Sequence, residues 1–371
     1  MRPPGYDIEV KAALLRSQSE PMTVESIWLR NVGPSDVRVR IEVTGVCHSD
    51  LSLARGVIAQ ELPAVLGHEA CGTVVEVGSE VKDLDVGQRV VLLWLSTCGV
   101  CFYCERGEGH LCVQGALRSK DPYAVDAEGN YIYPGLTVGS FAEQTVVPRN
   151  AVLPVPDDID SADAALLGCA VTTGVGAVVK TAEVEPNSSV MIIGLGGVGM
   201  SAVQGARLAG ASLIIAVDRS PAKAEQAKQA GAHHFFVAGD ELKSSVRSLT
   251  DKRGVDYAFD CVGSAATIRE TWSLSRRGGS TFVVGVGKKD DLVTFSALEL
   301  FHFARSLTGC VAGSIDAKRD LTEFYDWLRE GELDLKQLVT GHGKLEDIES
   351  AFDRMSQGEG LRTLIRPNTG S

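Results

Sequence analysis

The 371-residue sequence lacks long hydrophobic runs, because no stretch of 18 or more residues is continuously apolar. That absence excludes a membrane-spanning helix. The first residues, MRPPGYDIEV, contain no apolar core of the kind that secretory signals carry, so we expect no export. Internal repeats and low-complexity segments are missing too. With 44% hydrophobic and 23% charged residues, the composition is that of a soluble globular protein.

Basic residues are in short supply, with 36 Lys and Arg against 48 Asp and Glu, a net charge of −12. This balance argues against nucleic acid and anionic membranes as partners, and solubility explains it most simply. The nine cysteines are an odd number, and several are clustered. Without a signal, they favour metal ligands and reduced thiols over disulfides, which predicts a cytoplasmic protein. The length exceeds one compact core and predicts two domains.

A dinucleotide fingerprint lies between Val190 and Asp218. A buried-strand pattern over residues 190–193 precedes G-x-G-x-x-G, a helix-compatible segment and a second strand pattern that ends at Asp218. The residues assigned to the glycine turn are Gly194, Gly196, Gly197, Val198 and Gly199. The pattern predicts a βαβ unit that binds a dinucleotide, since the positive end of the helix attracts the pyrophosphate.

Each glycine of the turn has a physical role. Gly194 permits the tight turn, Gly196 lets the backbone approach a pyrophosphate, and Gly199 lets helix and strand pack without an intervening Cβ. Asp218 can accept hydrogen bonds from both ribose hydroxyls and would repel a 2′-phosphate, which favours NAD. Arg219 follows it and keeps NADP open as an alternative.

Four cysteines stand close together within a loop rich in Gly and Glu. They are Cys98, Cys101, Cys104 and Cys112, spaced C-x2-C-x2-C-x7-C. Four thiolates at such spacing can surround one tetrahedral zinc ion with no open position, which predicts a structural site. An iron–sulfur cluster also takes four cysteines and is the alternative.

Strand patterns dominate the first part of the chain. In VRVRIEVTGV, alternate residues from Val37 to Val43 share one face. Residues 113–140 are predicted as a long polar loop. After the fingerprint, strand and helix patterns alternate, which predicts a doubly wound parallel sheet in an α/β protein. Two helical segments are expected beyond residue 312.

The order of the motifs resembles one family over nearly the whole chain. Cys47-His48-Ser49-Asp50 is followed by Gly67-His68-Glu69, the four-cysteine loop, the lone Cys169, GLGGVG and the strand-end Asp218. This resembles the zinc-dependent medium-chain alcohol dehydrogenases. The resemblance implies a GroES-like β-rich catalytic domain over residues 1–170, a Rossmann NAD-binding domain over 171–311, and a return to the catalytic domain over 312–371.

The resemblance also implies two zinc ions per subunit. Cys47, His68 and Cys169 occupy the positions of the catalytic zinc ligands, and they leave one tetrahedral position open for substrate or water. The four-cysteine loop would hold the structural zinc. Asp50 and Glu69 match acids that orient such ligands. Zinc would polarise the alcohol hydroxyl while a hydride passes to the nicotinamide of NAD.

Further roles come from the same resemblance. Ser49 matches the hydroxyl that takes the alcohol proton, but Ser52 stands where well-known members place a terminal histidine. The other matched positions are His48 and Arg362 at the pyrophosphate, Thr173 and Lys223 at the cofactor, and Trp94 and Leu136 at the substrate pocket. An apolar pocket wall suits primary alcohols with an aliphatic or aromatic body.

Three alternative functions stay open at this point. One is a formaldehyde dehydrogenase that acts on a thiol adduct, and the second keeps NAD permanently bound. The third is a non-catalytic binding or structural relative that has lost its metal, which the presence of all seven ligand residues disfavours. A homodimer is expected, with a homotetramer as the alternative, because an edge strand near Thr281–Val286 could pair with a second copy.

Overall fold

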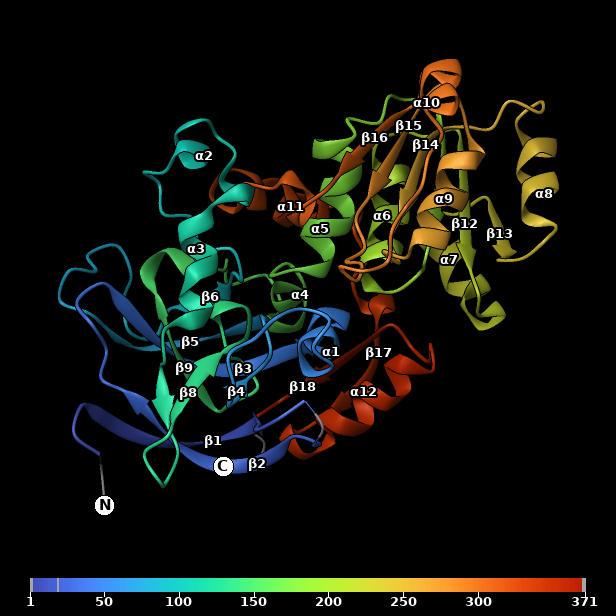
Figure 1. Ribbon diagram of the computed structural model, residues 1–371. Helices are drawn as coiled ribbons and strands as arrows, with labels where there is room; N and C mark the ends of the chain where they lie inside the picture. Colours follow the sequence, from blue (N-terminus) through green and yellow to red (C-terminus); the bar gives the residue numbers. More distant parts are fainter. Residues whose placement is uncertain (1–2, 19, 369–371) are drawn as a thin grey trace. The chain divides into compact units, whose positions relative to one another are not determined.

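The computed structural model describes residues 3–18 and 20–368, which Figure 1 shows coloured along the sequence. The chain divides into two compact units. The first comprises Met1–Cys169, Asp316–Leu328 and Val339–Ser371, and the second comprises Ala170–Ile315 and Arg329–Leu338. The predicted division differs from these bounds chiefly at residues 329–338, which pack with the second unit.

A closed barrel forms one part of the first unit, with the strand order β1-β2-β7-β8-β4. Its strands are β1 (Tyr6–Leu15), β2 (Thr23–Arg30), β4 (Ala64–Val65), β7 (Ala124–Val125) and β8 (Tyr131–Pro134). The prediction of a loop over residues 113–140 is wrong, because this segment contains α3 (Val113–Leu117) as well as β7 and β8. Val125 and Ile132 are buried there and hold the strands in the core.

A seven-stranded sheet forms the other part of the first unit, in the order β10-β6-β5-β3-β18-β17, with β9 also paired to β3. Its strands are β3 (Asp36–Val46), β5 (Glu69–Val77), β6 (Arg89–Leu92), β9 (Gln144–Pro148), β10 (Val152–Pro154), β17 (Val339–Gly343) and β18 (Arg362–Ile365). Alternate residues of β3 are fully buried, as the period of two predicts: Val37, Val39, Ile41 and Val43.

The first unit also contains helices. They are α1 (His48–Ala54), α2 (Phe102–Glu105), α3, α4 (Ser161–Leu166), α11 (Ala317–Arg329) and α12 (Ile348–Ser356). The two last ones confirm the helical segments expected beyond residue 312. The Asp160 side chain caps α4 by accepting a hydrogen bond from the Ala162 amide at 2.7 Å.

The second unit is a parallel sheet in the order β13-β12-β11-β14-β15-β16. Its strands are β11 (Ser189–Ile193), β12 (Leu213–Asp218), β13 (His234–Val237), β14 (Val255–Asp260), β15 (Ser275–Val283) and β16 (Ser306–Gly309). Its helices are α5 (Ala170–Gly176), α6 (Gly197–Leu208), α7 (Ala224–Ala230), α8 (Leu242–Leu249), α9 (Ala265–Leu274) and α10 (Ala297–Phe303). Counted from β11, this is the doubly wound order 3-2-1-4-5-6, so the predicted α/β fold class is confirmed.

The prediction of an edge strand near Thr281–Val286 is wrong. Residues near Thr281–Val286 are internal, because β15 pairs with β14 on one side and with β16 on the other. The edge strand is β16, whose four residues are all exposed. Among the described residues, no helix is long and apolar enough to cross a membrane.

Candidate active site and metal centres

Three strand ends meet in the first unit because of how β3 pairs. Its neighbours β5 and β18 both run antiparallel to it, so Gly45 lies opposite Glu69 and Val46 lies opposite Thr363. The carboxyl end of β3, with Cys47 beyond it, therefore lies beside the first residues of β5 and β18. This pairing brings together residues that are nearly 300 positions apart, Glu69 and Arg362 among them.

A cluster of candidate metal ligands lies at these strand ends. It consists of Cys47, His68, Glu69 and Cys169, whose ligand atoms all lie within 4.8 Å of one another. All four residues are buried. The three predicted ligands are thus close enough to share one ion, and the acid that follows His68 lies beside them.

The orientation of His68 is set by Asp50. Asp50 Oδ1 lies 2.9 Å from His68 Nδ1 and also accepts a hydrogen bond from the Gly67 amide at 2.9 Å. Asp50 Oδ2 accepts a third from the Cys47 amide at 3.1 Å. His68 Nε2 is buried and has no hydrogen-bond partner in the described part of the chain. A metal ion that faces two thiols and this nitrogen accounts for a buried ring nitrogen that is otherwise unsatisfied, so the donor set fits zinc.

The charges around the cluster differ from those of isolated side chains. A hydrogen bond from Cys169 lowers the pKa of the Cys47 thiol, burial opposes this shift, and the guanidinium of Arg362 lowers the pKa further. Burial raises the pKa of Glu69 to about 7, although Arg362 opposes that rise. Burial alone would lower the pKa of His68, but the Asp50 carboxylate raises it well above its usual value. The surroundings thus favour a thiolate at Cys47, the form that binds a metal.

Arg362 lies inside this cluster. Its Nε and Nη2 donate to the two Glu69 oxygens at 3.1 and 3.2 Å, and Nη2 lies 3.4 Å from the Cys47 sulfur. Its contact with a cofactor pyrophosphate stays a prediction. Sequence reasoning missed this ion pair, and it also missed Gly45, where a Cβ would come within 2.4 Å of Glu69 Oε2. No local pattern indicated either, because both depend on strand pairing.

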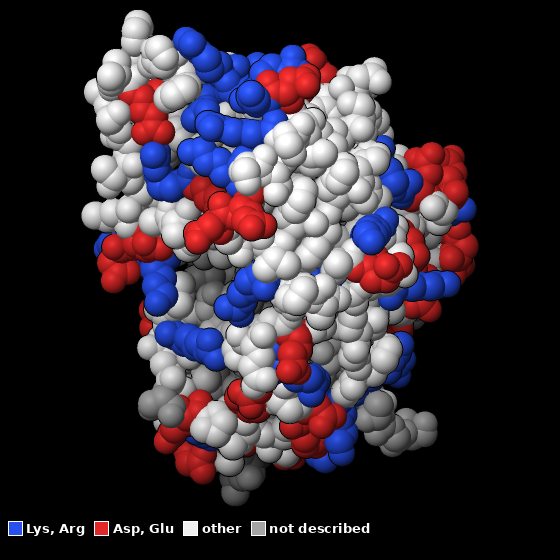
Figure 2. Space-filling model, turned by 90° about the vertical axis from the view of Figure 1, so that its right-hand side faces the viewer, with Lys and Arg blue, Asp and Glu red and all other residues white. Residues whose placement is uncertain are grey.

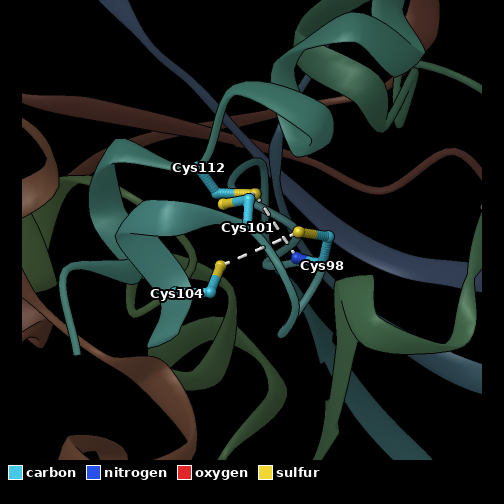
Figure 3. A group of neighbouring side chains, drawn as sticks. All are labelled: Cys98, Cys101, Cys104 and Cys112. Carbon is cyan, nitrogen blue, oxygen red and sulfur yellow. Dashed lines mark hydrogen bonds between the residues drawn. The ribbon is translucent and has the colours of Figure 1, made fainter. Parts of the chain in front are cut away.

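The four-cysteine loop forms a second, separate cluster in the first unit, shown in Figure 3. The sulfurs of Cys98 and Cys104 lie 3.9 Å apart, and so do those of Cys101 and Cys112. A zinc ion with four bonds of about 2.3 Å requires sulfurs about 3.8 Å apart in a regular tetrahedron. Sulfurs that bind the separate irons of an iron–sulfur cluster would have to lie further apart. The geometry therefore favours one ion.

Backbone amides support this second cluster. Those of Cys98 and Gly115 point at the Cys112 sulfur from 3.3 and 3.4 Å. Such bonds stabilise negative charge on a thiolate. A Cβ on Gly115 would lie 1.9 Å from the Ser96 carbonyl oxygen, so a glycine is required for this close approach.

The glycine turn of the second unit has the geometry that its spacing predicts. Gly194 has a φ of +91°, which lies in the region that favours glycine. A Cβ on Gly199 would lie 1.9 Å from the Gly194 carbonyl oxygen, whereas a Cβ on Gly196 would meet no atom within 4 Å. The space in front of Gly196, at the N-terminus of α6, is therefore open to a ligand.

Asp218 closes the turn at the end of β12. Its Oδ2 accepts a hydrogen bond from the Leu195 amide at 2.7 Å and pairs with Lys223 Nζ at 3.3 Å. Lys223 is buried rather than exposed on its helix. Arg219 follows Asp218, and Thr173 lies buried in α5 of the same unit.

The remaining predicted residues lie in the first unit. His48 and Ser49 form the first turn of α1, where His48 is exposed and Ser49 is half-buried. Trp94 and Leu136 are also half-buried. Thr137 Oγ1 donates to the Trp94 carbonyl at 2.9 Å, so the two predicted pocket segments adjoin.

Comparison with known proteins agrees with this geometry. The family description Alcohol dehydrogenase GroES-like domain matches residues 33–157, and Zinc-binding dehydrogenase matches residues 197–330. A curated S-(hydroxymethyl)glutathione dehydrogenase from Synechocystis is 34% identical over 367 residues, which span 96% of this chain and 99% of the relative. The chain belongs to the zinc-dependent medium-chain alcohol dehydrogenases.

Two solved structures of this family have the same fold. An alcohol dehydrogenase zinc-binding domain protein from Burkholderia ambifaria matches with a TM-score of 0.91 at 31% identity, over 97% of this chain and 99% of that one. The benzyl alcohol dehydrogenase from Acinetobacter calcoaceticus matches with a TM-score of 0.90 at 29% identity, over 97% and 100%. The predicted family and the oxidoreductase class are thereby confirmed, and the alcohol dehydrogenase has a cysteine-rich structural zinc site.

Proposed function

We propose that this alcohol dehydrogenase interconverts primary alcohols with an aliphatic or aromatic body and their aldehydes, with NAD as the hydride acceptor. The main support is the pair of Asp50 and His68, which leaves Nε2 without a hydrogen-bond partner among the described residues and beside two buried thiols. Zinc held there would supply Lewis-acid chemistry at the substrate oxygen, and NAD would be the hydride acceptor.

In this proposal Cys47, His68 and Cys169 hold the metal, and Asp50 keeps the His68 proton on Nδ1. Glu69 and Arg362 balance the charge beside Cys47. Ser49 receives the proton of the alcohol hydroxyl. Because Ser52 stands where a terminal histidine is expected, water completes the relay to solvent.

Cofactor choice follows from the buried carboxylate of Asp218. It accepts hydrogen bonds from ribose hydroxyls and repels a 2′-phosphate, which supports NAD over NADP. Gly196 and the start of α6 receive the pyrophosphate, and Lys223 lies beside the ribose. His48, Thr173, Arg219 and Arg362 are the further residues that we place at the cofactor.

Trp94 and Leu136 supply the apolar wall of the substrate pocket in this proposal. The benzyl alcohol dehydrogenase among the solved relatives supports an aromatic alcohol as substrate. The S-(hydroxymethyl)glutathione dehydrogenase relative supports a second candidate, a thiol adduct of formaldehyde. A cationic side chain in the pocket would be needed to bind the carboxylates of such an adduct.

A homodimer in the cytoplasm completes the proposal, with a homotetramer as the alternative. The edge strand β16 is exposed, and so are apolar side chains on it and on the preceding α10, namely Leu298, Leu300, Phe301 and Leu307. Pairing of two β16 edges would cover them. None of the nine cysteines forms a disulfide, which suits a reducing compartment.

A substrate screen tests the proposal. Benzyl alcohol, butanol and formaldehyde, the last with and without glutathione, are assayed with NAD and with NADP by the absorbance of the reduced nicotinamide. We expect the alcohols to turn over with NAD. Turnover only with formaldehyde and glutathione together would replace the proposal by the second candidate. NAD retained through gel filtration would identify a permanently bound cofactor.

A further inference from the structure

Arginines gather at the amino ends of neighbouring strands in the second unit. Arg276 and Arg277 lie near the start of β15, and Arg305 directly precedes β16. Arg247 lies in α8 and Arg269 in α9. Figure 2 shows the side of the molecule that lies on the right in Figure 1. Lys and Arg side chains gather near its top, at the height at which Figure 1 shows α10. The glycine turn follows the carboxyl end of β11. In a parallel sheet the arginines therefore lie at the opposite end of the strands, the amino end.

Arg305 is held by ring stacking. Its guanidinium lies over the Trp272 ring at 5.6 Å from the centroid and over the Phe303 ring at 4.4 Å. Its Nε donates to the Arg276 carbonyl at 3.2 Å. The two outer nitrogens make no hydrogen bond to any described residue. Stacking fixes the plane of the guanidinium and leaves these donors available.

Arg269 carries a donor that is buried and unpaired. Its Nη2 donates to Glu299 Oε2 at 3.2 Å, and its guanidinium lies 4.6 Å from the Phe295 centroid. Its Nη1 is buried and has no hydrogen-bond partner within residues 3–18 and 20–368. Glu299 is also used by Trp272 Nε1, which donates to it at 2.9 Å. An unpaired buried donor of a charged group is destabilising, so an acceptor for Arg269 Nη1 would be favourable.

Positive charge exceeds negative charge in this cluster. Glu299 pairs with Arg269 and Asp256 pairs with Arg276. Arg247, Arg277 and Arg305 form no ion pair with any acid among the described residues. Burial lowers the pKa of Arg305, Glu299 opposes this shift, and the nearby charges of Arg247 and Arg269 lower the pKa further. The cluster is therefore a local excess of mutually repelling cations on a chain whose net charge is −12.

We propose that Arg247, Arg269 and Arg305 form a binding site for a phosphate-class dianion, at the amino ends of the strands and opposite the glycine turn. A dianion would accept hydrogen bonds from the free nitrogens of Arg305, and a shift of the Arg269 side chain would bring its buried Nη1 within reach of the same anion. It would also neutralise the repulsion among the three guanidinium groups. Planar guanidinium forks match the oxygens of a phosphate in pairs, which a single ammonium cannot do.

Calorimetric titration of inorganic phosphate into the zinc-loaded enzyme tests the proposal. Saturating NAD occupies the glycine turn, and sodium chloride holds the ionic strength constant. We expect one phosphate per subunit in the wild type. Arg247→Gln changes an exposed side chain, so it leaves the fold intact, and it should weaken phosphate binding by roughly five- to tenfold. Arg305→Gln should weaken binding at least as much.

The matched control is Lys228→Gln, which removes one exposed positive charge from α7 of the same unit. Its phosphate affinity should equal that of the wild type. Equal affinities in Arg247→Gln and Lys228→Gln, or no binding beyond that of chloride, would overturn the proposal. AMP and adenosine distinguish the source of the anion. Tighter binding of AMP than of inorganic phosphate would identify a phosphoryl group carried by a nucleotide, and adenosine should not bind.

Discussion

Asp50 Oδ1 lies 2.9 Å from His68 Nδ1, and this contact decides which imidazole nitrogen can bind a metal. The proton of a neutral His68 stays on Nδ1, opposite the carboxylate, so the lone pair of Nε2 faces the two thiols. Asp50 also accepts hydrogen bonds from two backbone amides. One belongs to the ligand Cys47, and the other belongs to Gly67, which precedes the ligand His68. One carboxylate thus positions a ligand ring and two ligand-bearing loops.

Asp50→Asn should therefore weaken catalytic zinc binding. The amide keeps the volume but removes the negative charge, and it can present a donor to His68 Nδ1. We expect a fall in zinc affinity of about 10- to 100-fold, measured by competition with a chromophoric chelator. Asp85→Asn, an exposed position in the same unit, serves as the control. Unchanged affinity in Asp50→Asn would mean that the contact does not orient the ligand.

Cys112→Ser should release only the structural zinc. Cys112 is buried and its sulfur receives two backbone amides, so its loss removes both a ligand and the support of the loop. Metal analysis should find one zinc per subunit instead of two, and Tm should fall by about 10 °C or more. Cys261→Ser, outside both clusters, should retain two. Retention of both ions in Cys112→Ser would contradict a four-cysteine site.

Asp218→Ser should shift the cofactor preference toward NADP. The variant loses the acceptor for the ribose hydroxyls and the repulsion of a 2′-phosphate, while Lys223 and Arg219 remain beside it. KM for NAD should rise by about tenfold or more and KM for NADP should fall, because a like-charge contact costs several kcal/mol. Steady-state kinetics with both cofactors measures this. The exposed Asp240→Ser in the same unit should change neither value.

Leu307→Lys should separate the proposed dimer. Leu307 is 42% exposed on the edge strand β16, where a charge would have to be buried on pairing. Light scattering should report a monomer for this variant. Val237→Lys places the same charge on β13, the opposite edge of the sheet, where Val237 is 49% exposed. It should leave the dimer intact, and a dimer in both variants would exclude pairing through β16.

Cys310 predicts an alkaline loss of stability. Burial raises the pKa of its thiol, although a hydrogen bond from Thr181 opposes the shift. The folded state therefore keeps the proton after the unfolded chain has lost it. This contribution is complete below pH about 8.5, the unfolded value, and disappears as pH rises toward the folded pKa.

Cys310→Val removes this titration with little change of volume. Thr181 keeps a partner in the variant, since its Oγ1 also donates to Ser314 Oγ at 2.9 Å. In urea unfolding between pH 7.5 and 10, the wild type should lose up to about 1.4 kcal/mol per pH unit relative to the variant. A difference in unfolding free energy that is independent of pH would contradict the raised pKa.

Several features could be predicted because they depend on near neighbours in sequence. Gly194, Gly196 and Gly199 fall within six residues, so a turn that lacks a Cβ at these positions follows from the spacing alone. The alternating residues of β3 follow from the two-residue period of a strand in the same way. The prediction of an edge strand near Thr281 was wrong, because the sequence pattern there is compatible with an internal strand and with an outer strand. Only the pairing of β16 with β15 separates the two.

The sequence by itself determined the fold class, the family and the two groups of sulfur and nitrogen ligands, since these rest on local spacing and on the order of motifs along the chain. Only the tertiary structure decided that Arg362 reaches Glu69 and Cys47, that Gly45 leaves room for Glu69, and that the Arg305 guanidinium lies over Trp272. Each of these contacts joins residues that are distant in the chain, and antiparallel pairing or helix packing has to bring them together before any charge or cavity exists.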